Sequence, residues 1–437
     1  MNNQTLHQNR GWIALSPVIV FLLLYLVVSL ACGDFYKMPI SVALLAGSMW
    51  AVLLFRGRPL VQRVEVFSAS AANSHIIYMI WIFIMAGAFA SMAKAIGAVD
   101  ATVALTLKIF PPSLVVPGIF LAACLISLSI GTSVGTVVAL APLAVALVGD
   151  DYGARAFMTA VVLGGAFFGD NLSFISDTTI AATRTQGCSM ADKFRVNVWI
   201  AVPAALITLV VYLIVAHDTP AMISTGPNVD YWLVVPYLVV IVLAAAGVNV
   251  VAVLTIGILA AFALGLGYGY SALDIFSRMG EGIDSMGQLI IITLLAAGML
   301  GLIKAMGGLH WLLTRLSAHV HGVRGAQACI AVLTGLVNIC TANNTVAILT
   351  VGELSADISK RFGVDPRKSA SLLDTSSCVI QCLIPYGAQT LLASSLGGVS
   401  PAAPWPYLYY AWALALVTAL SIIFRFPRLT PKAQKEN

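Results

Sequence analysis

Long apolar segments recur along the whole chain and are separated by short polar stretches. Each approaches the ~20 residues that an α-helix needs to cross the roughly 30 Å hydrocarbon core of a bilayer. Because no water is available there to pair with backbone groups, α-helix is the expected structure in each segment. The pattern therefore predicts an all-α, polytopic membrane protein whose main apolar segments are 12–31, 39–55, 75–93, 196–216, 249–268, 287–303 and 404–424.

The composition excludes a soluble globular protein. Of the 437 residues, 60% are hydrophobic and 9% are charged, and the mean hydropathy is +0.96. A soluble domain carries about 25% charged residues, so this chain could not cover a water-facing surface of its size. The first apolar segment has no cleavage site leading into a soluble domain, which predicts a membrane helix and not a signal peptide. The net charge of +5 does not indicate nucleic acid, because the basic residues lie in predicted membrane loops.

Similar segments recur, in the same order, in the two halves of the chain. Four matches at separations of 209 to 211 residues predict an internal repeat, which is common in secondary transporters. The matches are KAIG at 94–97 with KAMG at 304–307, Thr132–Thr136 with Thr341–Thr345, Tyr152-Gly153 with Phe362-Gly363, and IAATRTQG at 180–187 with LLASSLGG at 391–398.

The distribution of basic residues predicts the orientation of the repeats. If segments 113–149 and 325–359 are re-entrant hairpins, about ten helices cross the membrane and both termini are cytoplasmic. The 23 Lys and Arg residues then divide 18 inside to 5 outside, against 14 to 9 if both segments cross fully. The positive-inside rule favours the hairpins, and the two repeats are then inverted. This topology predicts cytoplasmic Lys193 and Arg324 and periplasmic Asp230 and Arg278.

The repeat boundaries divide the chain into five parts. Two leading transmembrane helices are expected in 1–74, and inverted repeat one in 75–216. A connecting helix in 217–248 precedes inverted repeat two in 249–424, and residues 425–437 form a cytoplasmic tail. Each repeat is expected to hold a re-entrant hairpin and a broken transmembrane helix.

The first pair of helix breaks is GTSVGT at 131–136 and CTANNT at 340–345. A break at membrane depth is tolerated where it faces protein or a water-filled cavity, and such breaks bind ions or substrates. We expect the two breaks to meet near the bilayer midplane, although ordinary Ser/Thr packing between helices is the alternative. The candidate binding residues are Thr132, Ser133, Thr136, Asn343, Asn344 and Thr345.

The second break of repeat one, GDNLSFISDTT at 169–179, contains two carboxylates, Asp170 and Asp177. A carboxylate near the bilayer centre costs about 2.5–3.5 kcal/mol, and such residues usually face cavities or ion paths. We predict that Asp177, Ser176 and Thr178 bind Na⁺, since hard cations take oxygen ligands. For Asp170 the alternatives are a helix cap or a pair with Arg184. The further candidates in this break are Asn171 and Ser173.

The matching break of repeat two, QCLIPYGAQT at 381–390, has no carboxylate. Instead, Asp374 lies one to two turns upstream, followed by Ser376, and is a candidate proton or second-cation site. The repeated architecture therefore predicts asymmetric binding chemistry.

The run GDNLSFISDTT, with GTSVGT before it, resembles the NhaC-type Na⁺/H⁺ antiporter family of bacterial inner membranes. The resemblance extends over 75–424 and implies the ion transporter superfamily fold, Na⁺ and H⁺ as coupling ions and a multi-pass location in the bilayer. The sequence leaves the oligomeric state open, with a homodimer as one option. Two positions depart from the family pattern: Asn171 stands where Lys is frequent, and Phe174 where Pro is frequent. The residues that match are Gly169, Asp170, Ser173, Ser176, Asp177, Thr178 and Thr179.

Three classes of function remain open from the residues. The first is Na⁺/H⁺ antiport, and the second is Na⁺- or H⁺-coupled transport or exchange of a small carboxylate or amino acid, which Asn343 and Asn344 would suit. The third is an intramembrane enzyme, against which the sequence has neither HExxH nor GxSxG. We expect a transporter without a cofactor.

Overall fold

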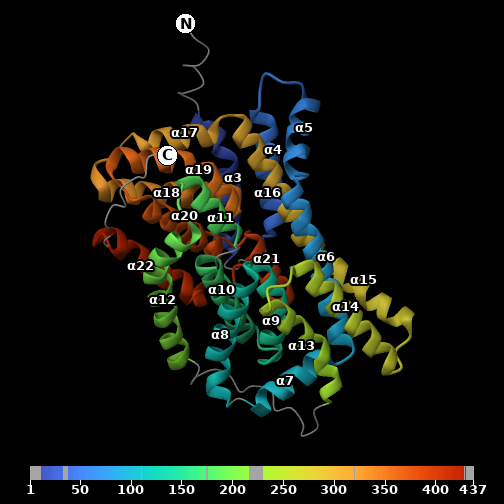
Figure 1. Cartoon of the computed structure of the whole chain (residues 1–437). Helices are drawn as coiled ribbons and strands as arrows, with labels where there is room; N and C mark the ends of the chain where they lie inside the picture. Colours follow the sequence, from blue (N-terminus) through green and yellow to red (C-terminus); the bar gives the residue numbers. More distant parts are fainter. Residues whose placement is uncertain are drawn as a thin grey trace.

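The computed structural model describes residues 11–32, 38–109, 111–173, 176–215, 230–318, 320–427 and 429. Phe174, residues 217–229 of the predicted connecting segment and the tail beyond residue 429 lie outside the described residues. Nearly all the described residues belong to α-helices (Figure 1). The prediction of an all-α protein is confirmed.

The helices of the first half run from the short α2 to α12. They are α2 (Gly11–Ala14), α3 (Ser16–Cys32), α4 (Ile40–Leu54), α5 (Leu60–Ala71), α6 (Ser74–Ala95), α7 (Ala98–Ile109), α8 (Pro112–Ile130), α9 (Ser133–Ala146), α10 (Tyr152–Leu172), α11 (Asp177–Gln186) and α12 (Met190–Val215).

The helices of the second half follow in a matching order of long and short elements. They are α13 (Tyr231–Ala245), α14 (Val250–Gly267), α15 (Ala272–Ser285), α16 (Gly287–Ala305), α17 (Gly308–Ser317), α18 (Gly322–Thr341), α19 (Asn344–Phe362), α20 (Pro366–Leu383), α21 (Ala388–Gly397), the 3₁₀ turn η2 (Trp405–Tyr407) and α22 (Tyr409–Ile423).

Packing between the halves is reciprocal. Helix α5 packs against α16, and α15 packs against α6; likewise α9 packs against α21, and α19 against α11. The last helices of the two halves, α12 and α22, pack against each other. Figure 1 shows α7 and α17, which hold the same place in the two series, at opposite ends of the molecule.

The chain is a multi-pass membrane protein. Within the described residues, seven helices or continuous helical runs are long and apolar enough to span a bilayer, and the bent pair α7–α8 makes an eighth. Several of them direct large apolar side chains outward, such as Trp199, Leu206 and Val210 on α12. Such a surface suits lipid rather than water. The number of about ten crossing helices stays a prediction.

The predicted breaks are confirmed as interruptions between helices. Gly131 separates α8 from α9 with φ of 72°, and Ala342 separates α18 from α19 with φ of 49°. The N-caps that follow are Thr132 and Asn343. These caps lie 211 residues apart, whereas shared threonines in the sequence aligned Thr132 with Thr341, 209 residues apart.

Close packing of α8 against α10 explains the glycine that begins the polar run at 169. A Cβ on Gly169 would lie 2.1 Å from the Ser127 hydroxyl oxygen, and one on Gly165 would lie 2.5 Å from the Ala123 Cβ. Small residues one turn apart let helix backbones approach closely, as they commonly do in membrane bundles. The end of α10 is thereby fixed against α8, next to the first break.

Candidate functional site

The helix breaks of both halves border one cavity of about 80 Å³. The structure therefore brings together the segments around 132 and 343, as predicted. Several lining residues are pairs that lie 211 residues apart, so the cavity lies where the two series of helices meet. The lining residues are Tyr78, Met79, Ile82, Gly131, Thr132, Ser133, Val134, Asp170, Asp177, Thr178, Asn343, Asn344, Thr345, Gln381, Ala388 and Gln389.

Asp170 lies in the last turn of α10, and its side chain is only 4% exposed. Its Oδ1 accepts a hydrogen bond of 3.0 Å from the backbone N–H of Ser133, the first residue of α9. The first amides of a helix have no partner within the helix and favour negative charge. Asp170 thus caps α9 from a different helix and also lines the cavity. The helix-cap role and the binding-site role that the sequence offered for Asp170 therefore both apply.

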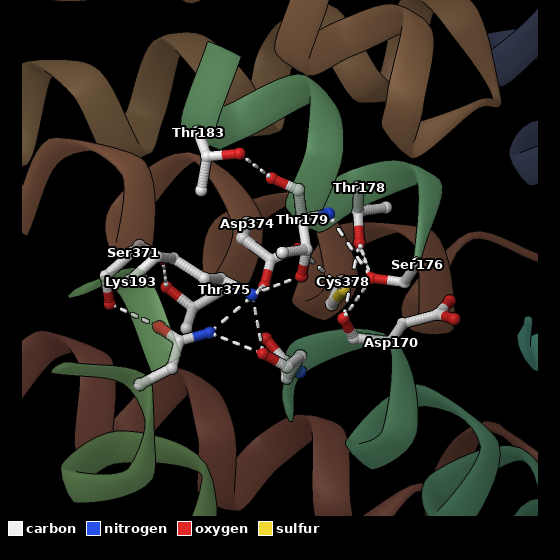
Figure 2. Close-up of polar contacts among 12 residues, drawn as sticks. Asp170, Ser176, Thr178, Thr179, Thr183, Lys193, Ser371, Asp374, Thr375 and Cys378 are labelled. Atoms are coloured by element: carbon white, nitrogen blue, oxygen red, sulfur yellow. Dashed lines mark hydrogen bonds and ion pairs between the residues drawn. The ribbon is translucent and has the colours of Figure 1, made fainter. Parts of the chain in front are cut away.

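Asp177 begins α11, and its side chain is exposed on the cavity. The neighbouring Ser176 caps α11 by accepting a hydrogen bond of 3.3 Å from the Thr179 N–H. The hydroxyls of Ser176 and Thr178 donate to the Asp170 carbonyl oxygen at 2.9 and 3.3 Å, and Figure 2 shows them converging on it. This leaves the Asp177 carboxylate free to turn toward the cavity while its neighbours fix the backbone.

Two glutamines complete the cavity on the side of the second half. Gln389 Nε2 donates to the Ser133 hydroxyl oxygen at 3.1 Å. Gln381 Nε2 donates to Gln389 Oε1 at 3.0 Å and to the Ala342 carbonyl at 2.9 Å. Gln381 and Gln389 occupy the positions that match Asp170 and Thr178. The cavity is therefore acidic on one side and amide-rich on the other.

Six predicted residues do not line the cavity. They are Ser176, Asp374, Asn171, Thr136, Ser173 and Ser376. Asn171 donates to the Phe167 carbonyl at 3.0 Å, and the Thr136 hydroxyl donates to the Thr132 carbonyl at 3.2 Å. Ser173 ends α10, with its N–H donating to Gly169. Ser376 lines a separate apolar groove between α18, α20 and α22.

Asp374 is completely buried and forms an ion pair with Lys193, with 2.5 Å between Oδ2 and Nζ. The same oxygen accepts a hydrogen bond of 3.0 Å from Asn197 Nδ2. Lys193 was counted among the loop residues, but it lies in the first turn of α12 with 1% exposure. That assignment was wrong, because the carboxylate that compensates the buried ammonium comes from a distant part of the chain.

A family model described as the Na⁺/H⁺ antiporter family matches residues 12–217 and 219–427. The chain belongs to the Na⁺/H⁺ antiporter family. The resemblance that the motif at 169–179 indicated is thereby confirmed, and a transporter, not an enzyme, is the family's class of protein.

Two relatives align with most of this antiporter. A malate-2H⁺/Na⁺-lactate antiporter of Bacillus subtilis is 22% identical over 94% of this chain and 94% of its own length. The Na⁺/H⁺ antiporter NhaC of Alkalihalophilus pseudofirmus is 26% identical over 68% of this chain and 69% of its own. The solved YdaH transporter of Alcanivorax borkumensis covers 84% of this chain and 88% of that chain at 15% identity, with a TM-score of 0.41.

The antiporter departs from the family motif at Asn171, where Lys is frequent. The Lys193 Nζ lies 2.6 Å from the backbone carbonyl oxygen of Asn171, whereas the Asn171 side chain contacts Phe167 and Tyr410. The motif alone suggested that a positive charge is lost beside Asp170. In the structure, α12 brings the Lys193 ammonium to the Asn171 backbone and to Asp374.

Sequence reasoning missed Lys193, Asn197, Gln381 and Gln389. Lys193 and Asn197 stand four residues apart at the start of an apolar helix, a spacing that puts them on one helical face. That spacing was the available signal for the first pair. For the glutamines the signal was the 211-residue register, which places them opposite Asp170 and Thr178.

Proposed function

We propose that this antiporter exchanges Na⁺ for H⁺ at the cavity between the helix breaks. One observation supports this most strongly: Asp170 and Asp177 face the same small cavity, together with neutral oxygens from both halves. Carboxylate, hydroxyl and amide oxygens are the ligands that a hard cation such as Na⁺ prefers.

Competition between the two ions for the carboxylates follows from their charges. A nearby cation favours the ionised form of a carboxyl group, and protonation removes the charge that holds the cation. Na⁺ and H⁺ therefore exclude each other at Asp177, the carboxylate that is free to turn into the cavity. Asp170 adds a second negative charge and keeps α9 in place.

Alternation of access follows from an inverted relation between the two halves. The matching order of helices, their reciprocal packing and the opposite placement of α7 and α17 support this inverted relation.

The correspondence between the helices of the two halves begins earlier than residue 75, because α3, α4 and α5 match α13, α14 and α15 in order. Lys193 and Lys368 are buried and are therefore removed from the count of Lys and Arg residues on the two sides of the membrane. The predicted topology then has 16 basic residues inside and 5 outside, which still satisfies the positive-inside rule.

A second candidate is coupled exchange of a small carboxylate or amino acid. The amide side of the cavity, with Asn343, Asn344, Gln381 and Gln389, favours it, as does the malate-2H⁺/Na⁺-lactate antiporter among the relatives. The cavity of about 80 Å³ is, however, far below the roughly 300–1,000 Å³ typical of sites for drug-sized ligands. This volume accommodates an inorganic ion, and the carboxylates of Asp170 and Asp177 favour a cation over an organic anion.

The test is ion flux in proteoliposomes that contain the purified protein and a trapped pH dye. An imposed Na⁺ gradient should drive proton movement in the opposite direction, and choline in place of Na⁺ should not. Malate, lactate and amino acids are then added singly on either side. Proton movement that requires one of these solutes, and not Na⁺ alone, would replace the proposal by the second candidate.

A further inference from the structure

The ammonium of Lys193 lies in a cage of three oxygens from three helices. Its Nζ is 2.6 Å from the Asn171 carbonyl oxygen in the last turn of α10 and 2.7 Å from the Thr179 hydroxyl oxygen in the first turn of α11. The third oxygen is Oδ2 of Asp374 on α20, at 2.5 Å. Figure 2 shows the group in the centre of these contacts.

The cage accounts for every proton of the ammonium group. A charged lysine has three N–H donors, whereas the neutral amine has two donors and a lone pair. The three oxygens around Nζ, one of them a carboxylate oxygen, match the three donors of the ammonium in number. The Asn171 carbonyl, in the last turn of α10, belongs to the negative end of that helix, which adds to the attraction.

Asn197 binds two of the three cage oxygens. Its Nδ2 donates to the Asn171 carbonyl oxygen at 2.7 Å and to Asp374 Oδ2 at 3.0 Å, and its Oδ1 accepts from the Ser371 hydroxyl. Two of the three cage oxygens are thus positioned independently of Lys193. We expect them to stay close together when the amine is removed.

The carboxylate, carbonyl and hydroxyl oxygens of the cage are ligands of the type that hard cations take. We propose that this cage is a second monovalent-cation site beside the exchange cavity, and that Lys193 occupies it permanently as a built-in cation. This inference rests on the proposed function, because it assigns some acidic residues to ion exchange and another to the compensation of Lys193. Asp374 is neutralised by Lys193, and ion exchange is left to Asp170 and Asp177.

Removing the amine should convert the built-in cation into a dependence on free Na⁺. The experiment measures the melting temperature of purified Lys193→Ala in detergent, in NaCl and in choline chloride at equal ionic strength. All the proteins also carry Asp177→Asn, which removes the charge that Na⁺ would meet in the exchange cavity. The matched controls are Asp177→Asn alone and the triple variant with Asp177→Asn, Lys193→Ala and Asp374→Asn.

Na⁺ should raise the melting temperature of Lys193→Ala by roughly 2–4 °C more than that of either control. An equal response of all three proteins would overturn the proposal. Lys193→Ser, which adds a hydroxyl beside the cage, is the second variant if Lys193→Ala is poorly folded. Failure of both variants to fold in NaCl as well as in choline would also count against it, since a cage that accepts a free cation should be rescued by one.

The outcome is separable from that of the proposed function. Wild-type protein that shows no Na⁺-driven proton flux in proteoliposomes contradicts exchange at the cavity. The melting temperatures of the Lys193 variants report on the cage alone.

Discussion

The matched breaks at 169–179 and 381–390 have the same backbone plan and different chemistry. In the first, Asp170 and Asp177 face the cavity; in the second, Gln381 and Ala388 occupy the corresponding positions. The one carboxylate near the second break, Asp374, is paired with Lys193. Geometry is repeated where the backbone must break, while the carboxylates that line the cavity come from the first half alone. The comparison teaches that architecture and ion chemistry are separate properties of the repeat.

The largest expected effect on stability concerns the paired carboxylate of the second half. In Na⁺-free solution, Lys193→Ala should lower the free energy of unfolding by about 3–5 kcal/mol, because it leaves the Asp374 charge buried and unpaired. The apolar pair Lys193→Met with Asp374→Leu should restore most of this loss. Denaturant or thermal unfolding of Lys193→Met, Asp374→Leu and the double variant measures the coupling. Equal, additive losses would show that the pair is not coupled.

A smaller effect is expected for Asp170→Asn in the first half. The amide oxygen can still accept the Ser133 N–H, so we expect a loss of only about 1 kcal/mol from the missing charge at the N-terminus of α9. Exchange should fall roughly tenfold, equivalent to about 1.4 kcal/mol at the binding site. Flux at several Na⁺ concentrations measures it. Wild-type flux in this variant would restrict Asp170 to its capping role.

The amide side should contribute least. Gln389→Ala removes one hydrogen bond to Ser133, for which we expect about 0.5–1 kcal/mol and a two- to fivefold weaker apparent affinity for Na⁺. Gln389→Glu is the informative companion, because it places a carboxylate on the neutral side. If Gln389→Ala abolished flux altogether, the amide side would be as important as the acidic side. This result would contradict the claim that ion exchange depends mainly on the carboxylates of the first half.

The inverted relation is tested by the sidedness of two exposed residues. Arg324 is expected on the cytoplasmic side and Arg278 on the periplasmic side, and both side chains are exposed. In right-side-out membrane vesicles, an impermeant maleimide should label Arg278→Cys and not Arg324→Cys. The unsubstituted protein is the control for labelling of the native cysteines. Labelling of both from the same side would remove the inversion.

Local signals in the sequence located the breaks but not their partners. Gly131, Gly169 and the polar residues after them interrupt apolar segments, so the breaks were predictable from neighbouring residues alone. Eight of the candidate site residues line the cavity, among them Asp170, Asp177 and Asn343.

What the sequence could not provide was the pairing of distant segments. Lys193 follows a polar turn and has the local pattern of a loop charge; its burial depends on Asp374, 181 residues away. The role of Gln389 likewise depends on its contact with Ser133 in the other half. Both contacts require the tertiary arrangement of α12, α20 and α21, which no local pattern specifies.

The most direct test of the central claim is Na⁺-driven proton flux of Asp177→Asn in proteoliposomes. Asn keeps the size and polarity of the side chain and removes the charge, and the exposed position predicts little change in stability. Asp284→Asn, an exposed acidic residue at the end of α15, is the matched control. We predict background flux for Asp177→Asn and wild-type flux for Asp284→Asn at equal protein content. Wild-type flux in Asp177→Asn would contradict the claim that the cavity between the breaks binds the exchanged ions.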